Sequence, residues 1–410
     1  MNFNRLPLDL QDIRGLTRLG FDATRGVTSL VENMHANIVA KPGFGGLKRE
    51  HARGISGFVY RCVRGVTEVI GGGVDALLGA LSQPDDNKES TPSREALLAA
   101  INGVLGDYLL ASANPLAITM SLRIKGHPVP LTREGLAAAL PQATGRILIL
   151  LHGLCMNDLQ WQHNGFDFGA DLAVDGYTPL YLHYNTGRHI SENGREFASL
   201  LAQLTNAWPT RIEELVLVGH SMGGLVARSA CHIAEQEAHV WLNTPTRMIF
   251  LGSPHHGSPL EKGGHWLDLL IGATPYTAAF TLLGKIRSAG ITDLRHGYVR
   301  DEDWRSRDRF AHERAPMDIC PLPTGVRCYA LAATLAKKAD GKLDLVGDGL
   351  VRVASALGKH KRSGRMLNIP PEHQRVLYGA SHIDLLGHAE VLATLREWLV
   401  SSPALIGHES

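Results

Sequence analysis

Seven short runs rich in β-branched and leucine residues, separated by longer helical or loop segments, constrain the fold of this chain most. The separating segments are mostly long enough for crossover connections, so the strands can run in one direction. Middle runs such as "ELVLVG" are almost continuously apolar, as a strand must be when helices cover both faces of its sheet. We therefore predict an α/β fold with a mostly parallel central sheet. The predicted strands are residues 116–124, 146–152, 178–184, 214–219, 246–252, 326–333 and 374–379.

The part of the chain before these runs has apolar residues at helical spacing. Residues 8–40 and 55–81 predict helices, and the second has one long apolar stripe. Residues 82–95, rich in Pro, Ser and charge, predict an exposed linker. We expect a helical region at 1–110 and a catalytic domain at 111–410. A further helix is predicted at 94–112, with Thr91 or Ser93 as its N-terminal cap.

The apolar stripe at 55–81 has three possible roles. Arg61, Arg64, Glu68 and Asp75 interrupt it, and each charge is costly inside a bilayer, so we do not expect it to span a membrane. The helix can pack on its neighbours, lie on a lipid surface or associate with a second copy. Peripheral contact with a membrane therefore stays open, and so does the oligomeric state.

Composition narrows the class of protein. The 41 Lys and Arg balance 40 Asp and Glu over 410 residues, which gives no reason to expect nucleic acid as a partner. The five cysteines show no CxxC spacing, and we interpret them as reduced thiols; only Cys320 and Cys328 are close enough in sequence to suggest a bridge. The first twenty residues lack the features of a signal peptide, so we expect a cytoplasmic protein, for which peripheral contact with a membrane stays open.

The stretch "VLVGHSMGGL" at 216–225 places Ser221 in a G-x-S-x-G pattern between a predicted strand and a predicted helix. Glycines at the flanking positions let backbone segments pass closely in a sharp turn that strains the serine. Such a turn lifts the hydroxyl above the carboxyl ends of the strands, close to a helix N-terminus. Ser221 is therefore the candidate nucleophile.

A nucleophilic serine needs hydrogen-bond donors for the oxyanion that it generates. In "LHGLCMND", His152 and Gly153 end another central strand, so the backbone N–H of Leu154 can point into the same crevice. Together with the N–H of Met222, it forms the predicted oxyanion hole.

The serine also needs a base and an acid, which follow it in the chain order of this architecture. His382 in "GASHIDLLGH" follows the last predicted strand and precedes a predicted helix at 384–400; it is the candidate base. Asp348, between two glycines in "LVGDGLVRV", is the candidate acid that orients the imidazole. The alternatives are His388 and His373 for the base, and Asp344 for the acid.

These motifs resemble those of serine α/β-hydrolases of the lipase and esterase type, over about residues 116–400. The oxyanion turn "HGLCMND", the elbow "GHSMGG", "LGSPHHGSP", "GDGLV" and "SHIDLL" are similar to motifs of bacterial triacylglycerol lipases and related lipid deacylases. The resemblance implies Ser221 as nucleophile, Asp348 as acid, His382 as base, and Leu154 with Met222 as oxyanion donors. The helical N-terminal region and the missing secretion signal depart from the family pattern.

Two segments are predicted to surround the site. The stretch between Pro254 and Pro321 lacks strong strand signals and predicts a helical lid over an acyl pocket. Residues 184–194, "YNTGRHISENG", can form a rim of that pocket. His255 and His256 suggest a metal site, but no third ligand stands at a suitable spacing, so we expect neither a metal nor an organic cofactor.

The sequence therefore predicts an enzyme that cleaves carboxylic esters, with a lipid or other acyl ester as substrate. An acyltransferase would use the same catalytic residues and a different acceptor. A lipid-binding or scaffold protein without activity is the third possibility. Hydrolysis and acyl transfer differ in how well the pocket excludes water, which the sequence does not reveal.

Overall fold

A computed structural model of the chain describes residues 11–22, 90–258, 288–305, 319–337 and 347–400. Most of the helical region predicted at 8–40, the helix predicted at 55–81, most of the predicted linker and lid, and Asp344 lie outside these residues. The chain divides into two compact units: residues 1–94 with 109–117, and residues 95–108 with 118–410. The second unit contains the sheet.

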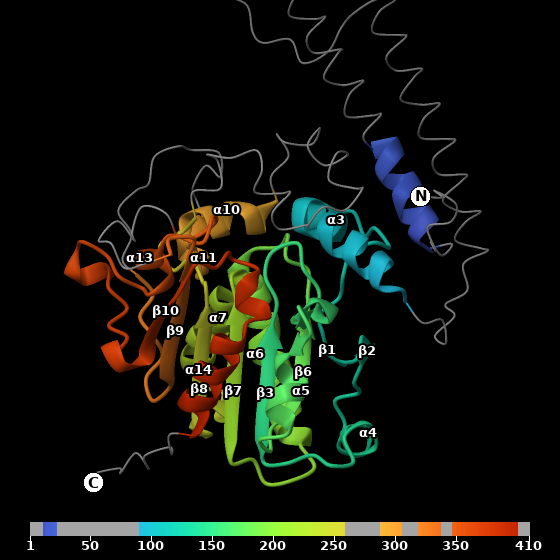
Figure 1. Cartoon of the computed structure of the whole chain (residues 1–410). Coiled ribbons are helices and arrows are strands. Elements are labelled where there is room, and N and C mark those ends of the chain that lie inside the picture. Colours follow the sequence, from blue (N-terminus) through green and yellow to red (C-terminus); the bar gives the residue numbers. More distant parts are fainter. Residues whose placement is uncertain (1–10, 23–89, 259–287, 306–318, 338–346, 401–410) are drawn as a thin grey trace, which may run out of the picture. The chain divides into compact units, whose positions relative to one another are not determined.

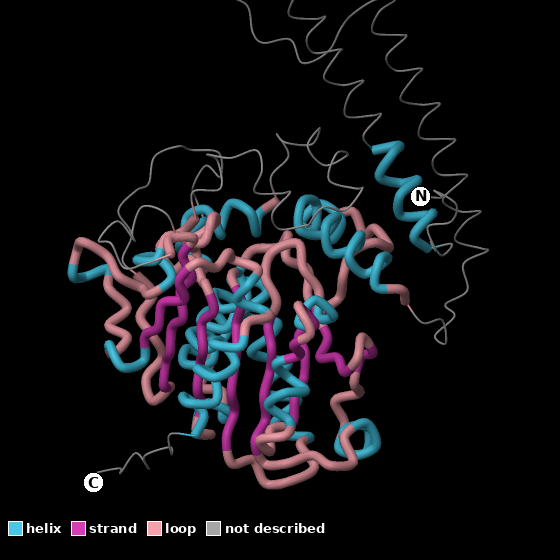
Figure 2. The backbone as a smooth tube through the Cα atoms, viewed as in Figure 1, coloured by secondary structure: helices cyan, strands magenta, loops and turns pink. Residues whose placement is uncertain are grey.

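The strands and helices of the second unit follow each other in an alternating order (Figures 1 and 2). The strands are β1 (Ser121–Ile124), β2 (His127–Pro128), β3 (Arg146–Leu151), β4 (Gln162–His163), β5 (Phe166–Asp167), β6 (Thr178–His183), β7 (Glu214–His220), β8 (Thr246–Leu251), β9 (Arg327–Thr334) and β10 (Gln374–Tyr378). The α-helices are α3 (Pro92–Ala111), whose two ends belong to the first unit, α4 (Arg133–Ala139), α5 (Phe168–Ala173), α6 (Ile190–Ala207), α7 (Met222–Gln236), α10 (Ala289–His296), α11 (Asp301–Trp304), α13 (Val353–Ala356) and α14 (Ala389–Val400). The 3-10 helices are η1 (Asp158–Trp161), η2 (Val240–Asn243), η4 (Ser363–Arg365), η5 (Pro371–His373) and η6 (Asp384–Leu386).

The central sheet has the strand order β10-β9-β8-β7-β3-β6-β1-β2. The six strands from β10 to β6 are parallel, and the sheet has antiparallel pairs at one edge, where β1 pairs with β6 and with β2. The prediction of a mostly parallel sheet is therefore confirmed. Because the carboxyl ends of parallel strands meet at one edge, the loops that follow β3, β7, β8 and β9 come together there.

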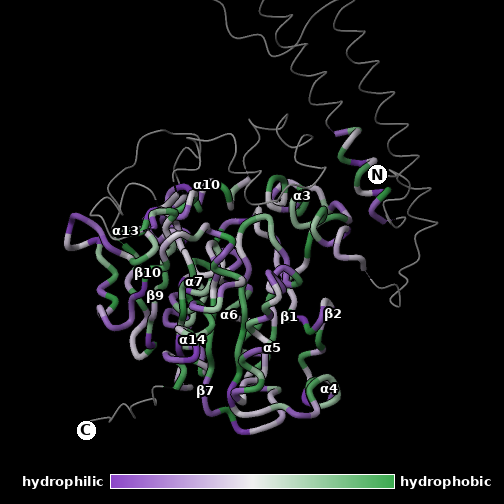
Figure 3. The backbone as a smooth tube through the Cα atoms, in the orientation of Figure 1, coloured by the Kyte–Doolittle hydropathy of each residue, from purple (hydrophilic) through white to green (hydrophobic). Residues whose placement is uncertain are grey.

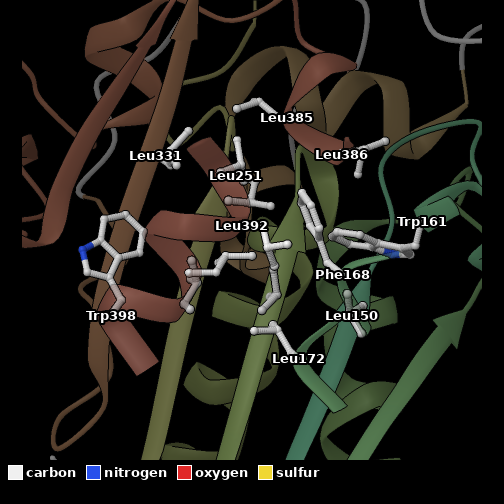
Figure 4. Close-up of a cluster of buried hydrophobic side chains, with 14 of the residues drawn as sticks. Leu150, Trp161, Phe168, Leu172, Leu251, Leu331, Leu385, Leu386, Leu392 and Trp398 are labelled. Carbon is white, nitrogen blue, oxygen red and sulfur yellow. The ribbon is translucent and has the colours of Figure 1, made fainter. Parts of the chain in front are cut away.

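Helices cover the sheet on both faces, which explains why the central strands are apolar along their length (Figure 3). On one face, α5 and α14 contribute Phe168, Leu172, Leu392 and Trp398 to a buried cluster with alternate residues of the strands (Figure 4). On the other, α7 contacts β3, β7 and β8, and α6 packs against α7. This packing fixes the elbow that joins β7 to α7.

Two predicted elements are shorter than expected. Residues 116–120 do not join β1, because Asn114 accepts the N–H groups of Leu116 and Ala117 and closes a turn there. The helix predicted at 384–400 is interrupted: η6 ends at Leu386 and α14 begins at Ala389. At the break, a Cβ on Gly387 would lie 2.4 Å from the His163 carbonyl oxygen, so a side chain there would not fit.

The described part of the first unit is small. Residues 11–22 are helical, and Asp12 accepts two hydrogen bonds from the Arg94 guanidinium, at 2.5 and 2.7 Å. The predicted cap of α3 is confirmed at Thr91, whose hydroxyl accepts the N–H of Arg94 at 3.3 Å. A helix with the length and apolar character needed to cross a membrane is not found among the described residues.

Candidate active site

The turn between β7 and α7 holds Ser221 in a strained conformation, with φ of 53° and ψ of −119°. Close backbone contacts force this turn. A Cβ on Gly219 would lie 2.4 Å from Gly224 Cα, and one on Gly223 would lie 2.3 Å from the Leu151 carbonyl oxygen. Only glycine fits at these two positions. The strain at Ser221 is therefore built into the packing of α7 on β3, and it makes Ser221 a candidate for a functional role.

The turn after β3 lies directly beside the serine. A Cβ on Gly153 would lie 3.1 Å from Ser221 Cβ, so the two turns are in van der Waals contact. Within the described part of the chain, the N–H groups of Leu154 and Met222 donate no hydrogen bond to another residue. Met222 is the first residue of α7, where backbone N–H groups lack a partner in their own helix. Both amides are thus available to an oxyanion.

The β6–α6 loop braces this oxyanion turn. The Tyr184 hydroxyl donates to the His152 carbonyl oxygen at 2.7 Å, and the two rings stack with centroids 4.4 Å apart. Two residues later, the Thr186 hydroxyl oxygen accepts the N–H of Cys155 at 3.1 Å. Leu154 is therefore held from both sides by residues of the segment 184–194, which the sequence predicted as a rim of the pocket and not as a support of this turn.

Asp348 and His382, 34 residues apart in sequence, meet as a buried pair. His382 Nδ1 lies 2.7 Å from Asp348 Oδ2, and the His382 N–H donates to the Asp348 carbonyl oxygen at 3.1 Å. The other carboxylate oxygen accepts the N–H groups of Leu350 and Val351, at 2.9 and 2.7 Å. Because a carboxylate without a proton only accepts, this geometry suits a donor at Nδ1 and leaves Nε2 outside the pair.

The imidazole of His382 lies beside the elbow. Its ring centroid is 4.7 Å from that of His220, the residue before Ser221, and His220 Nε2 donates to the His382 carbonyl oxygen at 3.1 Å. His382 Nε2 is buried and has no hydrogen-bond partner among the described residues, Ser221 included. Nε2 is therefore the ring nitrogen of His382 that is left without a partner in this part of the chain.

Two other histidines near the serine are uncharged. Burial lowers the pKa of His152 to about 3. Burial, followed by the nearby charge of His382, lowers the pKa of His220 well below its ordinary value. A positive charge that forms on His382 during a reaction therefore has no competing imidazolium beside it.

The alternative residues from the sequence have other positions. His373 Nδ1 lies 3.2 Å from the Cys328 carbonyl oxygen and its ring packs on Tyr329, with centroids 4.1 Å apart. His388, expected inside the last helix, instead precedes α14, where its Nδ1 accepts the Glu390 N–H at 3.2 Å. Asp344 is not among the described residues.

His255 and His256 face different partners. His255 Nδ1 lies 3.2 Å from Arg228 Nη1, and burial, then the Arg228 charge, lowers the pKa of His255 well below its usual value. The ring of His256 lies 5.1 Å from that of His360. The two imidazoles therefore do not converge on one ion. The cysteines Cys155, Cys231, Cys320 and Cys328 are free, which confirms the expectation of thiols for these four.

A buried cluster of Glu95, Asp158 and His183 has ligand atoms close enough for a metal ion. However, Arg123 Nη1 already contacts both carboxylates, at 2.9 Å from Glu95 Oε2 and 3.2 Å from Asp158 Oδ1. Burial alone would raise the pKa of Asp158, but the nearby His183, with Nδ1 3.1 Å from Asp158 Oδ1, and the Arg123 charge outweigh it and lower that pKa. The cluster is thus an ion-pair network that holds η1, just after the oxyanion turn, against β1 and β6.

Residues 142–320 match the protein family described as the PGAP1-like alpha/beta domain. Solved structures with a similar fold include the mature lipase BlEst2 of Bacillus licheniformis (16% identity, TM-score 0.41, covering 68% of this chain and 96% of that one). A lipase-esterase related protein of Clostridium acetobutylicum has 12% identity and a TM-score of 0.34, over 62% of this chain and 95% of that one. The esterase Pf2001 of Pyrococcus furiosus has 13% identity and a TM-score of 0.37, over 62% and 83%. No curated protein matches the chain.

Proposed function

We propose that this chain, whose residues 142–320 match the PGAP1-like alpha/beta domain, is a serine hydrolase that cleaves carboxylic esters. One observation carries the proposal: the buried Asp348–His382 pair lies against His220, the residue before the strained Ser221, and Nε2 of His382 is the ring nitrogen that the pair leaves without a partner among the described residues. The two unbonded amides of Leu154 and Met222 supply what the oxyanion needs.

In the proposed reaction, Ser221 Oγ attacks the ester carbonyl carbon while His382 Nε2 takes the hydroxyl proton. The N–H groups of Leu154 and Met222 donate to the oxyanion of the tetrahedral intermediate. The C–O bond to the alcohol then breaks, and His382 returns the proton to the leaving alcohol. Water, activated by the same imidazole, attacks the acyl-enzyme and releases the acid. Asp348 remains ionised throughout and stabilises the imidazolium.

Turnover of p-nitrophenyl esters graded from short to long acyl chains tests this proposal. The wild-type protein should hydrolyse them, and the chain-length preference would separate an esterase from a lipase. Ser221→Ala should lose activity by about 10⁴-fold or more, because the nucleophile is gone. Ser199→Ala, which removes an exposed hydroxyl of α6, is the matched control and should keep full activity. Appreciable turnover by Ser221→Ala would refute the assignment.

The acceptor of the acyl group separates the proposed hydrolase from an acyltransferase with the same residues. With an added short alcohol, a hydrolase should still give mostly free acid, whereas a transferase would give mostly the new ester. Product analysis by mass spectrometry distinguishes the two. An ester product at low alcohol concentration would favour the transferase.

We further propose a lipid or another acyl ester as the substrate, with peripheral contact to a lipid surface through the N-terminal region. The apolar stripe at 55–81 motivates this part, and it lies outside the described residues. Deletion of residues 1–90 should weaken binding to phospholipid vesicles more than it lowers hydrolysis of a short soluble ester. Equal vesicle binding by the full-length protein and the deletion variant would contradict contact with a lipid surface through the N-terminal region.

A further inference from the structure

Helix α3 precedes the family match at 142–320, yet its residues 95–108 cluster with the sheet. The helix lies near α10 in Figure 1. The Ser288 hydroxyl donates to the Gly103 carbonyl oxygen at 2.6 Å, and Asp107 Oδ2 accepts the Ala289 N–H at 3.0 Å. These contacts fix α3 at the edge of the sheet where Ser221 stands.

The two glycines of α3 mark where the helix meets the candidate site. A Cβ on Gly103 would lie 2.2 Å from Cys155 Sγ and 3.0 Å from Cys155 Cα, inside the oxyanion turn. A Cβ on Gly106 would lie 1.8 Å from Asn185 Oδ1 in the β6–α6 loop, which braces the same turn. Glycine is a poor helix former, so its use twice inside one helix points to these close contacts.

The contact with Cys155 is the one that bears on chemistry. Cys155 follows Leu154 directly, has a φ of 59°, and is fully enclosed by the protein. Its N–H is held by Thr186 on one side, and its side chain and Cα lie against Gly103 on the other. The orientation of the preceding Leu154 N–H therefore depends on how closely α3 approaches.

We infer that α3 is a positioning element of the oxyanion hole, and that Gly103 sets the position of the Leu154 N–H through Cys155. This inference rests on the proposed function. An oxyanion donor acts mainly in the transition state, and a displacement of a few tenths of an ångström weakens it without changing how the ground-state ester binds. Gly103 therefore acts on kcat rather than on KM.

Gly103→Ala tests the inference with a short soluble ester such as p-nitrophenyl butyrate. We expect kcat to fall by about tenfold or more while KM changes by less than about twofold. Alanine favours helix over glycine, so the loss would not come from a weaker α3. The matched control is Gly364→Ala, where a Cβ meets nothing within 4 Å, and it should keep wild-type kcat.

A second substitution provides the rescue. Cys155→Gly removes the side chain that the new methyl group would meet, and glycine tolerates the positive φ of this residue. In Gly103→Ala/Cys155→Gly, kcat should return to that of Cys155→Gly alone. If Gly103→Ala does not fold, Gly103→Ala/Cys155→Ala gives the result, because the Cβ of residue 155, at 3.1 Å, still meets the new methyl group there and is absent from the glycine variant. A reduced kcat at unchanged KM in that protein supports the inference.

The outcomes separate this inference from the proposed function. An active wild type together with a folded Gly103→Ala that matches it in kcat would overturn the role of α3 alone. A fall in kcat that Cys155→Gly does not reverse would also overturn it, because the loss would then not pass through Cys155. A wild type that neither hydrolyses esters nor reacts with an acylating probe would overturn the proposed function, and the role of α3 with it.

Discussion

Among the described residues, His152, His220 and His382 lie around the turn that holds Ser221, and their hydrogen bonds decide which one can act as a base. His152 Nδ1 lies 2.9 Å from the Gly153 carbonyl oxygen, and His220 Nε2 is bound to the His382 carbonyl oxygen. Only His382 has a carboxylate on Nδ1. A carboxylate stabilises the imidazolium form, whereas a backbone carbonyl does so much less.

In the proposed mechanism Asp348 orients the base, so replacing its carboxylate by an amide should lower kcat strongly. Asp348→Asn keeps the shape, but the amide can donate to His382 Nδ1, which moves the ring hydrogen to Nε2 and blocks the base. We expect kcat to fall by about 10³-fold to 10⁴-fold. Circular dichroism should show an unchanged fold, since the asparagine oxygen can still accept the two backbone N–H groups. A loss of less than tenfold would show that Asp348 does not orient the base.

Substitution of His220 should lower kcat by a smaller factor, because His220 only positions His382. Its Nε2–H and its ring hold the backbone and the imidazole of His382. His220→Ala should lower kcat by about 10-fold to 100-fold through misplacement of His382. His220→Gln, whose amide can donate to the same carbonyl oxygen, should recover much of that loss. Equal kcat values for the alanine and glutamine variants would contradict a role for this hydrogen bond.

The β6–α6 loop connects three elements: the oxyanion turn, α3 and α10. Asn185 Nδ2 donates to the Gly106 carbonyl oxygen at 3.0 Å, and the Gly290 N–H donates to the Gly187 carbonyl oxygen at 3.0 Å. At the start of α6, the buried Asp293 of α10 accepts the Ile190 N–H at 2.8 Å. The loop is thus a junction between elements distant in sequence.

Tyr184→Phe tests this junction. The substitution leaves the ring stacked on His152 but removes the hydroxyl, so the buried carbonyl oxygen of His152 loses its donor. We expect a loss of about 1–3 kcal/mol in the free energy of unfolding and a lower kcat with little change in KM. Urea unfolding and initial rates measure the two effects. Unchanged kcat in a destabilised protein would limit Tyr184 to a structural role.

The strands, the elbow and its neighbouring turn could be predicted because local patterns encode them. Continuous apolar runs marked β3 and β7, and the glycines around Ser221 marked the turn. The contacts of α3 with Cys155 and of Tyr184 with His152 join residues far apart in the chain, and no local spacing reveals them. The break at Gly387 could not be predicted for the same reason, since the His163 carbonyl oxygen that excludes a side chain comes from another element.

The whole molecule carries several buried neutral histidines, which makes its stability depend on pH. Burial lowers the pKa of His152 to about 3 and of His256 to about 4, and those of His220 and His255 also lie well below the ordinary value. As pH falls below about 6.5, the unfolded chain takes up protons that the folded chain refuses. The contribution of these histidines to the free energy of unfolding is therefore full above about pH 6.5 and is lost as pH falls towards their pKa values in the folded protein.

Each such histidine contributes a slope of up to about 1.4 kcal/mol per pH unit. Asp293 has the opposite effect on stability below pH 6, because burial raises its pKa to about 6 and the folded protein then binds a proton that the unfolded chain releases. This effect offsets the slope that about one of the four histidines contributes. The urea midpoint, followed by tryptophan fluorescence, should fall steadily from pH 7 to pH 5. His255→Gln, which keeps an acceptor for Arg228, should show a shallower fall. A midpoint that stays constant over this range would contradict the neutral state of these side chains.

The proposal that Ser221 is an activated nucleophile can be tested by covalent labelling. A fluorophosphonate reacts with a serine only when a base removes its proton and donors stabilise the adduct. Treatment of the full-length protein, followed by peptide mass spectrometry, should find one phosphonylated site, at Ser221, and no adduct in His382→Ala at the same exposure. A protein that stays unlabelled, or that carries the adduct on another residue, would contradict a hydrolase built on Ser221, Asp348 and His382.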